Sequence, residues 1–134
     1  MNQMPATPQY ERLSDAAFTT GDTRYTGESA VVWYSRRDSF RDFSMGAEFL
    51  REQGVALPTL ETLENTHVRV GALGETDPDR IFVMMQGEVW SPLGQARTFL
   101  RSIGSGHTSM SVGDVIQIGN ALYMVETVGF ERIA

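Results

Sequence analysis

The residues between positions 105 and 114 include the side-chain types that hydrolytic enzymes use for nucleophilic attack. His107 is a base, Ser109 and Ser111 carry hydroxyl groups, and Asp114 is an acid able to orient the base. The same residue types beside glycines also form hydrogen-bonded turns, in which hydroxyl and carboxylate oxygens bind nearby backbone amides. Because no Gly-x-Ser-x-Gly signature accompanies them, the sequence favours a structural or binding role over a small enzyme centred on His107.

A second cluster of chemically useful side chains is basic. Arg36, Arg37 and Arg41 follow Trp33 and Tyr34, and guanidinium groups beside aromatic rings pair with phosphates and stack on bases. Aspartates interleave with these arginines, a pattern that is also typical of a solvated helix start. Any contact with nucleic acid is therefore expected to use this local patch.

No metal site or cofactor is predicted. The two histidines, His67 and His107, lie far apart in the sequence, and there is no cysteine to supply a thiolate ligand. The alternating acids of residues 75–79 lack the glycine and the final glutamate of a calcium loop. Residues 104–106 end a predicted helix and no lysine follows, which argues against a phosphate-binding nucleotide loop.

The length and charge of the chain limit its class. Its 134 residues and 14.9 kDa suffice for one ordinary globular domain. Seventeen acids against eleven bases, all arginine, give a net charge of −6, which disfavours a large basic surface for nucleic acid. No apolar run of about 18 residues and no signal-peptide pattern is present, so we expect no membrane segment and a cytoplasmic location.

Hydrophobic periodicity separates the predicted helices from the predicted strands. Phe40, Phe43, Ala47 and Leu50 fall on one helical face, whereas residues 29–35 have the β-branched and aromatic density of a buried strand. The predicted elements are a strand over 29–35, a helix over 39–53, one or two helical turns within 58–65, strands over 66–73 and 81–85, a helix over 92–103, and a hairpin formed by 112–118 and 122–128.

This order, β-α-β-β-α-β-β, predicts an α+β fold. We expect a small sheet of about five strands with two amphipathic helices packed on one face, in a ferredoxin-like topology. A small β-barrel with external helices is the alternative. Residues 28–134 are predicted to form a single domain, preceded by a partly ordered N-terminal arm over residues 1–27, which is rich in Thr, Asp, Gln, Pro and Gly.

The C-terminal segment, residues 81–133, resembles the YodL-like domain family of conjugative elements, plasmids and phages. The similarity rests on the motif Gly-His-Thr-Ser-Met-Ser-Val-Gly-Asp-Val at 106–115, the hairpin after it, and Gly-Phe at 129–130. The chain departs from the family pattern at 108–110, where the serine spacing shifts and Met110 replaces leucine, and at Gly113, which replaces serine. The resemblance implies a mobile-element origin and a role in countering host defence or supporting transfer. It implies no catalytic residue.

These observations favour a non-enzymatic protein-binding module of a phage or other mobile element, inhibiting a host defence system by steric occlusion. The expected partner is a host or element protein, and the edge of the last hairpin could also pair with a second copy of the chain. Alternatives are a nucleic-acid-binding accessory protein and the small enzyme described above. The candidate binding residues are Arg36, Arg37, Arg41, Trp90, His107, Ser109, Ser111 and Asp114.

Overall fold

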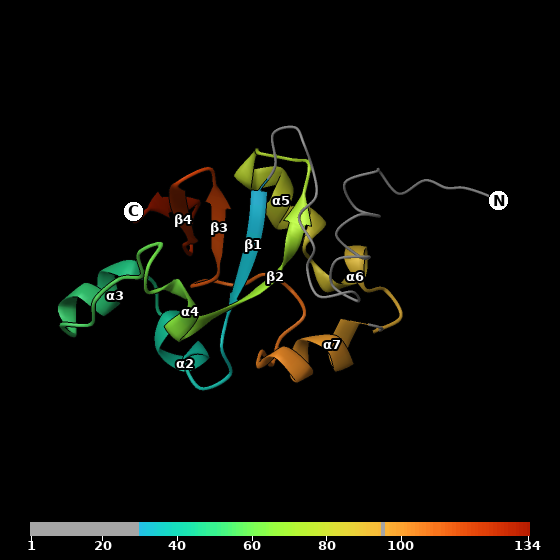
Figure 1. Cartoon of the computed structure of the whole chain (residues 1–134), viewed down its shortest axis with the longest axis horizontal. Coiled ribbons are helices and arrows are strands. Elements are labelled where there is room, and N and C mark those ends of the chain that lie inside the picture. Colours follow the sequence, from blue (N-terminus) through green and yellow to red (C-terminus); the bar gives the residue numbers. More distant parts are fainter. Residues whose placement is uncertain (1–29, 95) are drawn as a thin grey trace.

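An open antiparallel sheet forms the centre of the computed structural model, which describes residues 30–94 and 96–134 (Figure 1). The strand order is β2-β1-β3-β4-β5. The predicted N-terminal arm, residues 1–27, lies outside the described residues. The strands are β1 (Ala30–Ser35), β2 (His67–Leu73), β3 (Val115–Ile118), β4 (Ala121–Val125) and β5 (Phe130–Arg132).

Strand β1 lies inside the sheet, with a neighbouring strand on each side. It pairs with β2 on one side, from Ala30 opposite Leu73 to Ser35 opposite His67, and with β3 on the other. The register against β2 shifts between Val32 and Trp33, so one extra residue enters β2 there. The bulge increases the local twist of the sheet.

One group of helices covers the face of the sheet to which Trp33 belongs. It consists of α2 (Phe40–Phe43), α3 (Ala47–Glu52) and α4 (Leu63–Thr66). Their buried side chains pack against β3 and β4. The buried members of this cluster are Phe43, Ala47, Leu50, Leu63, Val115, Leu122 and Met124.

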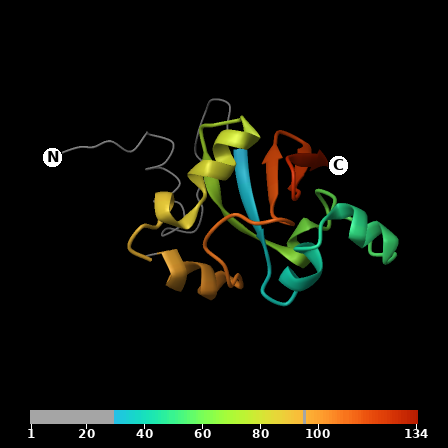
Figure 2. The ribbon, with the colours of Figure 1, turned by 180° about the vertical axis from the view of Figure 1, so that it is seen from behind.

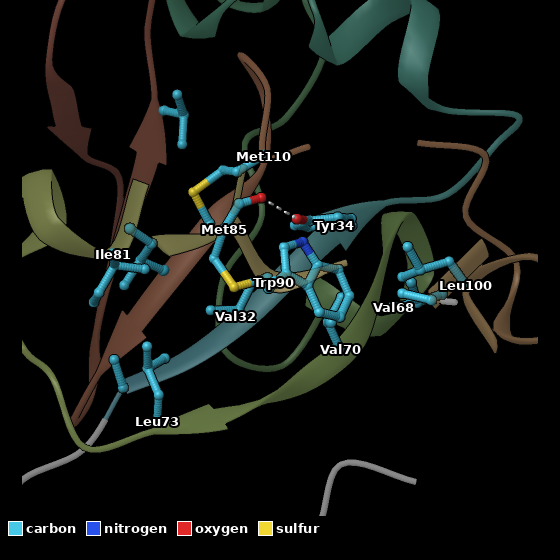
Figure 3. Close-up of a cluster of buried hydrophobic side chains, with 14 residues drawn as sticks. Val32, Tyr34, Val68, Val70, Leu73, Ile81, Met85, Trp90, Leu100 and Met110 are labelled. Atoms are coloured by element: carbon cyan, nitrogen blue, oxygen red, sulfur yellow. Dashed lines mark hydrogen bonds between the residues drawn. The ribbon is translucent and has the colours of Figure 1, made fainter. Parts of the chain in front are cut away.

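A second group, α5 (Pro78–Met84), α6 (Gly87–Trp90) and α7 (Ala96–Ile103), covers the opposite face. Since successive residues of a strand point to opposite faces, Val32 and Tyr34 of β1 join this second cluster (Figure 3). Trp90 lies at its centre and is fully buried. Figures 1 and 2 show the two helix groups on different sides of the sheet.

Two polar groups inside the second cluster are satisfied by carbonyl oxygens. The Tyr34 hydroxyl donates to Thr108 O at 2.7 Å and lies 3.3 Å from Met85 O, a contact drawn in Figure 3. The indole Nε1 of Trp90 donates to Thr108 O at 3.1 Å. The loop that carries Thr108 is therefore bound to the core by two aromatic side chains.

The α+β class and a sheet of five strands are confirmed within the described residues, but the topology differs from the predicted one. In a ferredoxin-like sheet, two strands joined by a crossover helix are parallel and have another strand between them, whereas β1 and β2 here are direct antiparallel neighbours. The sheet is open, so the barrel alternative is also wrong. Helices cover both faces rather than one, because the two predicted amphipathic helices pack against opposite sides of β1.

The predicted strand over 81–85 is wrong, because these residues belong to helix α5 and its C-terminal end. A short apolar run does not distinguish a strand from a buried helix. The helix is started by local chemistry: the Asp77 side chain accepts a hydrogen bond from Asp79 N at 3.0 Å, and Pro78 occupies the first helical position. Residues 77–79 thus form the capped first turn of this helix.

The two predicted helices are shorter than expected. The helix over 39–53 is divided into α2 and α3 at Gly46, whose φ of +93° is not helical. The helix over 92–103 begins only at Ala96, whose amide donates to Ser91 Oγ at 2.9 Å. Leu93, which lies within the range predicted for this helix, is outside α7 and is 90% exposed. None of the helices in the described residues is long and apolar enough to cross a membrane.

Candidate functional site

A buried carboxylate organises the loop that precedes β3. Asp114 is fully buried, and its oxygens accept hydrogen bonds from Ser35 N and Ser111 N, each at 2.8 Å, and from His107 Nε2 at 2.8 Å. A buried charge is tolerated when hydrogen bonds replace its lost hydration. These bonds join the end of β1 to the loop over residues 105–114.

His107 lies between two aromatic rings. Its ring stacks on Tyr34 with centroids 4.7 Å apart and an interplanar angle of 13°, and Phe40 covers it at 4.7 Å. Nδ1 lies 3.3 Å from Ser105 Oγ, which also lies 3.3 Å from Ser35 O. The His107 side chain is 14% exposed, and these contacts together with the Asp114 bond hold the imidazole ring in place.

The structure brings together His107, Ser111 and Asp114, but in a different relation from that of a hydrolase. The serine beside His107 is Ser105, whose exposed fraction is 1%. A nucleophilic hydroxyl must be directed at its substrate, whereas the Ser105 hydroxyl donates to Ser35 O. Ser111 uses its amide rather than its hydroxyl toward Asp114. The geometry therefore stabilises a loop conformation.

Ser109 and Ser111 have local roles in the same loop. Ser109 Oγ accepts a hydrogen bond from Gly87 N at 2.8 Å, which fixes the loop to the start of α6. Ser111 Oγ donates to Ser109 O at 2.9 Å. Both hydroxyl groups bind backbone atoms, as expected of turn-forming serines.

The environment of Asp114 also affects Tyr34. Burial, and secondarily the charge of Asp114, raises the pKa of Tyr34 well above its ordinary value. The phenol therefore stays protonated and remains the donor toward Thr108 O throughout the neutral range.

His67 is a buried residue to which the sequence assigned no role. Its Nε2 donates to Gly113 O at 2.8 Å, its Nδ1 accepts from the Thr66 hydroxyl at 2.8 Å, and its ring packs on Phe43. Burial lowers the pKa of His67 below its ordinary value, so the ring is neutral in the folded state. The alternation of apolar residues in the strand over 66–73 predicts that His67 lies on the polar face, so its burial differs from the sequence pattern.

The lowered pKa of His67 predicts a loss of stability in mild acid. The unfolded chain binds a proton at this residue as the pH falls through about 6.5, while the folded chain resists protonation. The free energy of unfolding should therefore decrease as the pH falls below about 6.5, by at most about 1.4 kcal/mol per pH unit from this group. Urea denaturation at a series of pH values measures it. In His67→Gln the decrease should be smaller, and an unchanged pH slope would contradict the assignment.

Four arginines surround the glycine-containing loop after α7, and we call them the arginine face: Arg36, Arg37, Arg97 and Arg101. Two of them, with Asp38 and Gly104, line a cavity of about 330 Å³. The other two line an adjacent cavity of about 280 Å³, which we call the α7 cavity. Its lining residues are Arg97, Leu100, Arg101, Ser105, Gly106, His107 and Thr108.

The glycines of this loop allow the arginines to approach it closely. A Cβ atom added to Gly104 would lie 3.3 Å from Arg36 Nη1, and one added to Gly106 would lie 3.5 Å from Arg37 Nε. Arg36 is oriented by two hydrogen bonds to Glu64 O, at 3.1 and 2.9 Å. Arg37 N donates to Gly104 O at 2.8 Å, which joins β1 to the loop.

Two predicted binding residues lie elsewhere. Arg41 is exposed on α2 and lines neither cavity of the arginine face. Trp90 is fully buried, so its predicted role as a surface contact is wrong. Arg97 and Arg101 were missed, although their i, i+4 spacing places them on one helical face. Their proximity to Arg36 and Arg37 depends on tertiary contacts that the sequence pattern does not contain.

The described residues contain no group of three histidine or acidic side chains placed to hold a metal ion. The site therefore consists of two parts, an inward-facing Asp114–His107 pair and an outward-facing arginine face. No family model matches the chain, and neither a curated protein nor a solved structure does.

Proposed function

We propose that the chain is a non-enzymatic module that binds a nucleic acid strand through the arginine face. The observation that carries the proposal is that none of these four guanidinium groups forms an ion pair with a carboxylate among the described residues. Charged side chains that a fold needs for its own stability are usually paired or dispersed. Four of them around one loop indicate an external anionic partner.

The inward orientation of the histidine supports binding rather than catalysis. The carboxylate of Asp114 and the Nε2 atom of His107 are hydrogen-bonded to each other. Ser105, the hydroxyl nearest the other ring nitrogen, is buried. A general base must reach the proton that it removes. Because His107 and Asp114 are bonded to each other, their role in this proposal is to stabilise the loop conformation.

Phosphate groups suit the arginine face because guanidinium groups bind phosphate oxygens in bidentate geometry. The net charge of −6 opposes association at long range, so binding must depend on close contacts at this loop. Such contacts release condensed counterions, and the affinity therefore falls as salt is added.

Fluorescence anisotropy of a labelled single-stranded oligonucleotide tests the proposal. If the four arginines each contact a phosphate, the slope of log K against log salt should be about −3. The affinity should then fall about 50-fold between about 50 and 200 mM salt. Arg37→Gln and Arg97→Gln should each make the slope of log K against log salt less steep, by the amount that one phosphate contact contributes.

Arg132 provides the matched control, because it is exposed on β5 and bonds to the terminal residue of the chain at Ala134 O. Arg132→Gln removes the same charge and should leave the affinity and the salt slope unchanged. Absence of binding at low ionic strength would contradict the proposal. An equal loss in Arg132→Gln and Arg97→Gln would do the same, since it would indicate a general effect of net charge.

A protein partner is the second candidate function, and exposed apolar residues favour it. Val83 on α5, Val89 on α6 and Leu93 are 60%, 39% and 90% exposed. In this proposal the chain is a cytoplasmic protein that occludes a host defence factor, and the resemblance of residues 81–133 to the YodL-like family is the reason for assigning it to a mobile element. A stoichiometric partner captured from host lysate should be lost in Val83→Asp and retained in Arg97→Gln. Retention of the partner by both variants would contradict binding through these exposed apolar residues.

A further inference from the structure

The α7 cavity has the size and donors of a site for a small anion. Its volume is about 280 Å³, and its polar lining comes from two arginines and the loop residues Ser105 to Thr108. Among the described residues, the backbone amides of Gly106, His107 and Thr108 donate no hydrogen bond. Successive backbone amides without acceptors are the donors from which anion-binding loops are built.

The positions of the two cavity arginines lower the stability of helix α7. Arg97 and Arg101 are four residues apart on one helix, where like charges repel. Arg97 also lies in the first turn of α7, where the helix dipole favours negative charge and where there is no acidic residue. A bound anion between the two guanidinium groups would remove both unfavourable terms.

The Asp114 carboxylate does not compete for these donors. Asp114 is buried and accepts hydrogen bonds from two backbone amides and from His107 Nε2. His107 lines the cavity and therefore stands between Asp114 and any bound anion. The donors that remain available are the two guanidinium groups and the three loop amides.

We propose that the α7 cavity binds a phosphate monoester, the group found at the end of a nucleic acid strand or on a free nucleotide. A monoester carries a charge of about −1.5 to −2 near neutrality and presents three terminal oxygens. The two guanidinium groups match this charge, and their planar forks bind oxygens in pairs. An internal phosphodiester carries one charge and two free oxygens, so it uses fewer of these donors.

This inference rests on the proposed function in one respect, since it assigns the strand end to the α7 cavity and the strand backbone to Arg36 and Arg37. The two parts are separable. Loss of Arg37 should weaken every oligonucleotide equally, whereas loss of Arg97 should remove the preference for a terminal phosphate.

Oligonucleotides of one sequence that carry a 5′-phosphate, a 3′-phosphate or only hydroxyl ends test the inference by fluorescence anisotropy. One or two additional charge-assisted hydrogen bonds should make a phosphorylated strand bind about tenfold or more tightly than the hydroxyl strand. Arg97→Gln and Arg101→Gln should reduce this ratio to about one. Arg37→Gln and Arg132→Gln should leave the ratio unchanged, and thermal unfolding checks that each variant is folded.

Inorganic phosphate and a nucleoside monophosphate, titrated directly by calorimetry, distinguish the source of the group. Binding of either that is lost in Arg97→Gln supports the site even if no oligonucleotide binds, in which case only the proposed function fails. Equal binding of phosphorylated and hydroxyl strands overturns the site and leaves the proposed function standing. Absence of binding by every probe overturns both.

Discussion

Replacing Asp114 with asparagine should lower the free energy of unfolding by about 3 kcal/mol, because the change removes a buried charge from three charge-assisted hydrogen bonds. The amide group of asparagine supplies one acceptor oxygen in place of two. At least one of the donors, Ser35 N, Ser111 N or His107 Nε2, then has no acceptor inside the protein. Urea denaturation monitored by tryptophan fluorescence measures the loss.

The matched control is Asp79→Asn, which removes the same charge from an exposed position in α5. It should change the stability by no more than about 0.5 kcal/mol. A double-mutant cycle with His107→Gln isolates the contact between the two side chains and should give a coupling energy of about 1 to 3 kcal/mol. Similar stabilities for Asp114→Asn and Asp79→Asn would show that the buried network contributes little.

The second large effect is expected at Gly113, where two constraints coincide. Its φ is +95°, a region that residues with a Cβ atom rarely adopt. A Cβ atom there would lie 2.4 Å from the backbone oxygen of Phe43 and 2.6 Å from its carbonyl carbon. Gly113 also donates to Val125 O and accepts from His67, so its backbone is held from two directions.

Gly113→Ala should therefore lower the free energy of unfolding by about 3 kcal/mol or more, or prevent folding at ordinary temperature. Gly119→Ala is the matched control, since Gly119 also has a positive φ, +61°, but no atom within 4 Å of an added Cβ. It should cost about 1 kcal/mol. The difference between the two variants measures the close contact with α2, and equal losses would assign the whole effect to backbone conformation.

Elements with strong local signals were predictable. The strand at 29–35, the strand at 66–73 and the final hairpin are present because β-branched and aromatic residues, bounded by turn residues, suit the half-buried, pleated surface of a sheet. The helix at 81–85 was not predictable from its apolar run, which fits a strand equally well. Asp77 and Pro78 carried the correct signal, but turn chemistry and helix capping use the same residue types.

The sequence by itself determined the α+β class, the strands near positions 30 and 70, and the C-terminal hairpin, because each depends on residues close together in the chain. Tertiary structure alone decided which sheet face each helix covers and which side chains meet at the site. Asp114 reaches the end of β1, and Arg97 and Arg101 lie beside the loop that Arg36 and Arg37 contact. Such contacts join segments that are distant in sequence, and their geometry follows from packing both faces of one sheet, which no local pattern encodes.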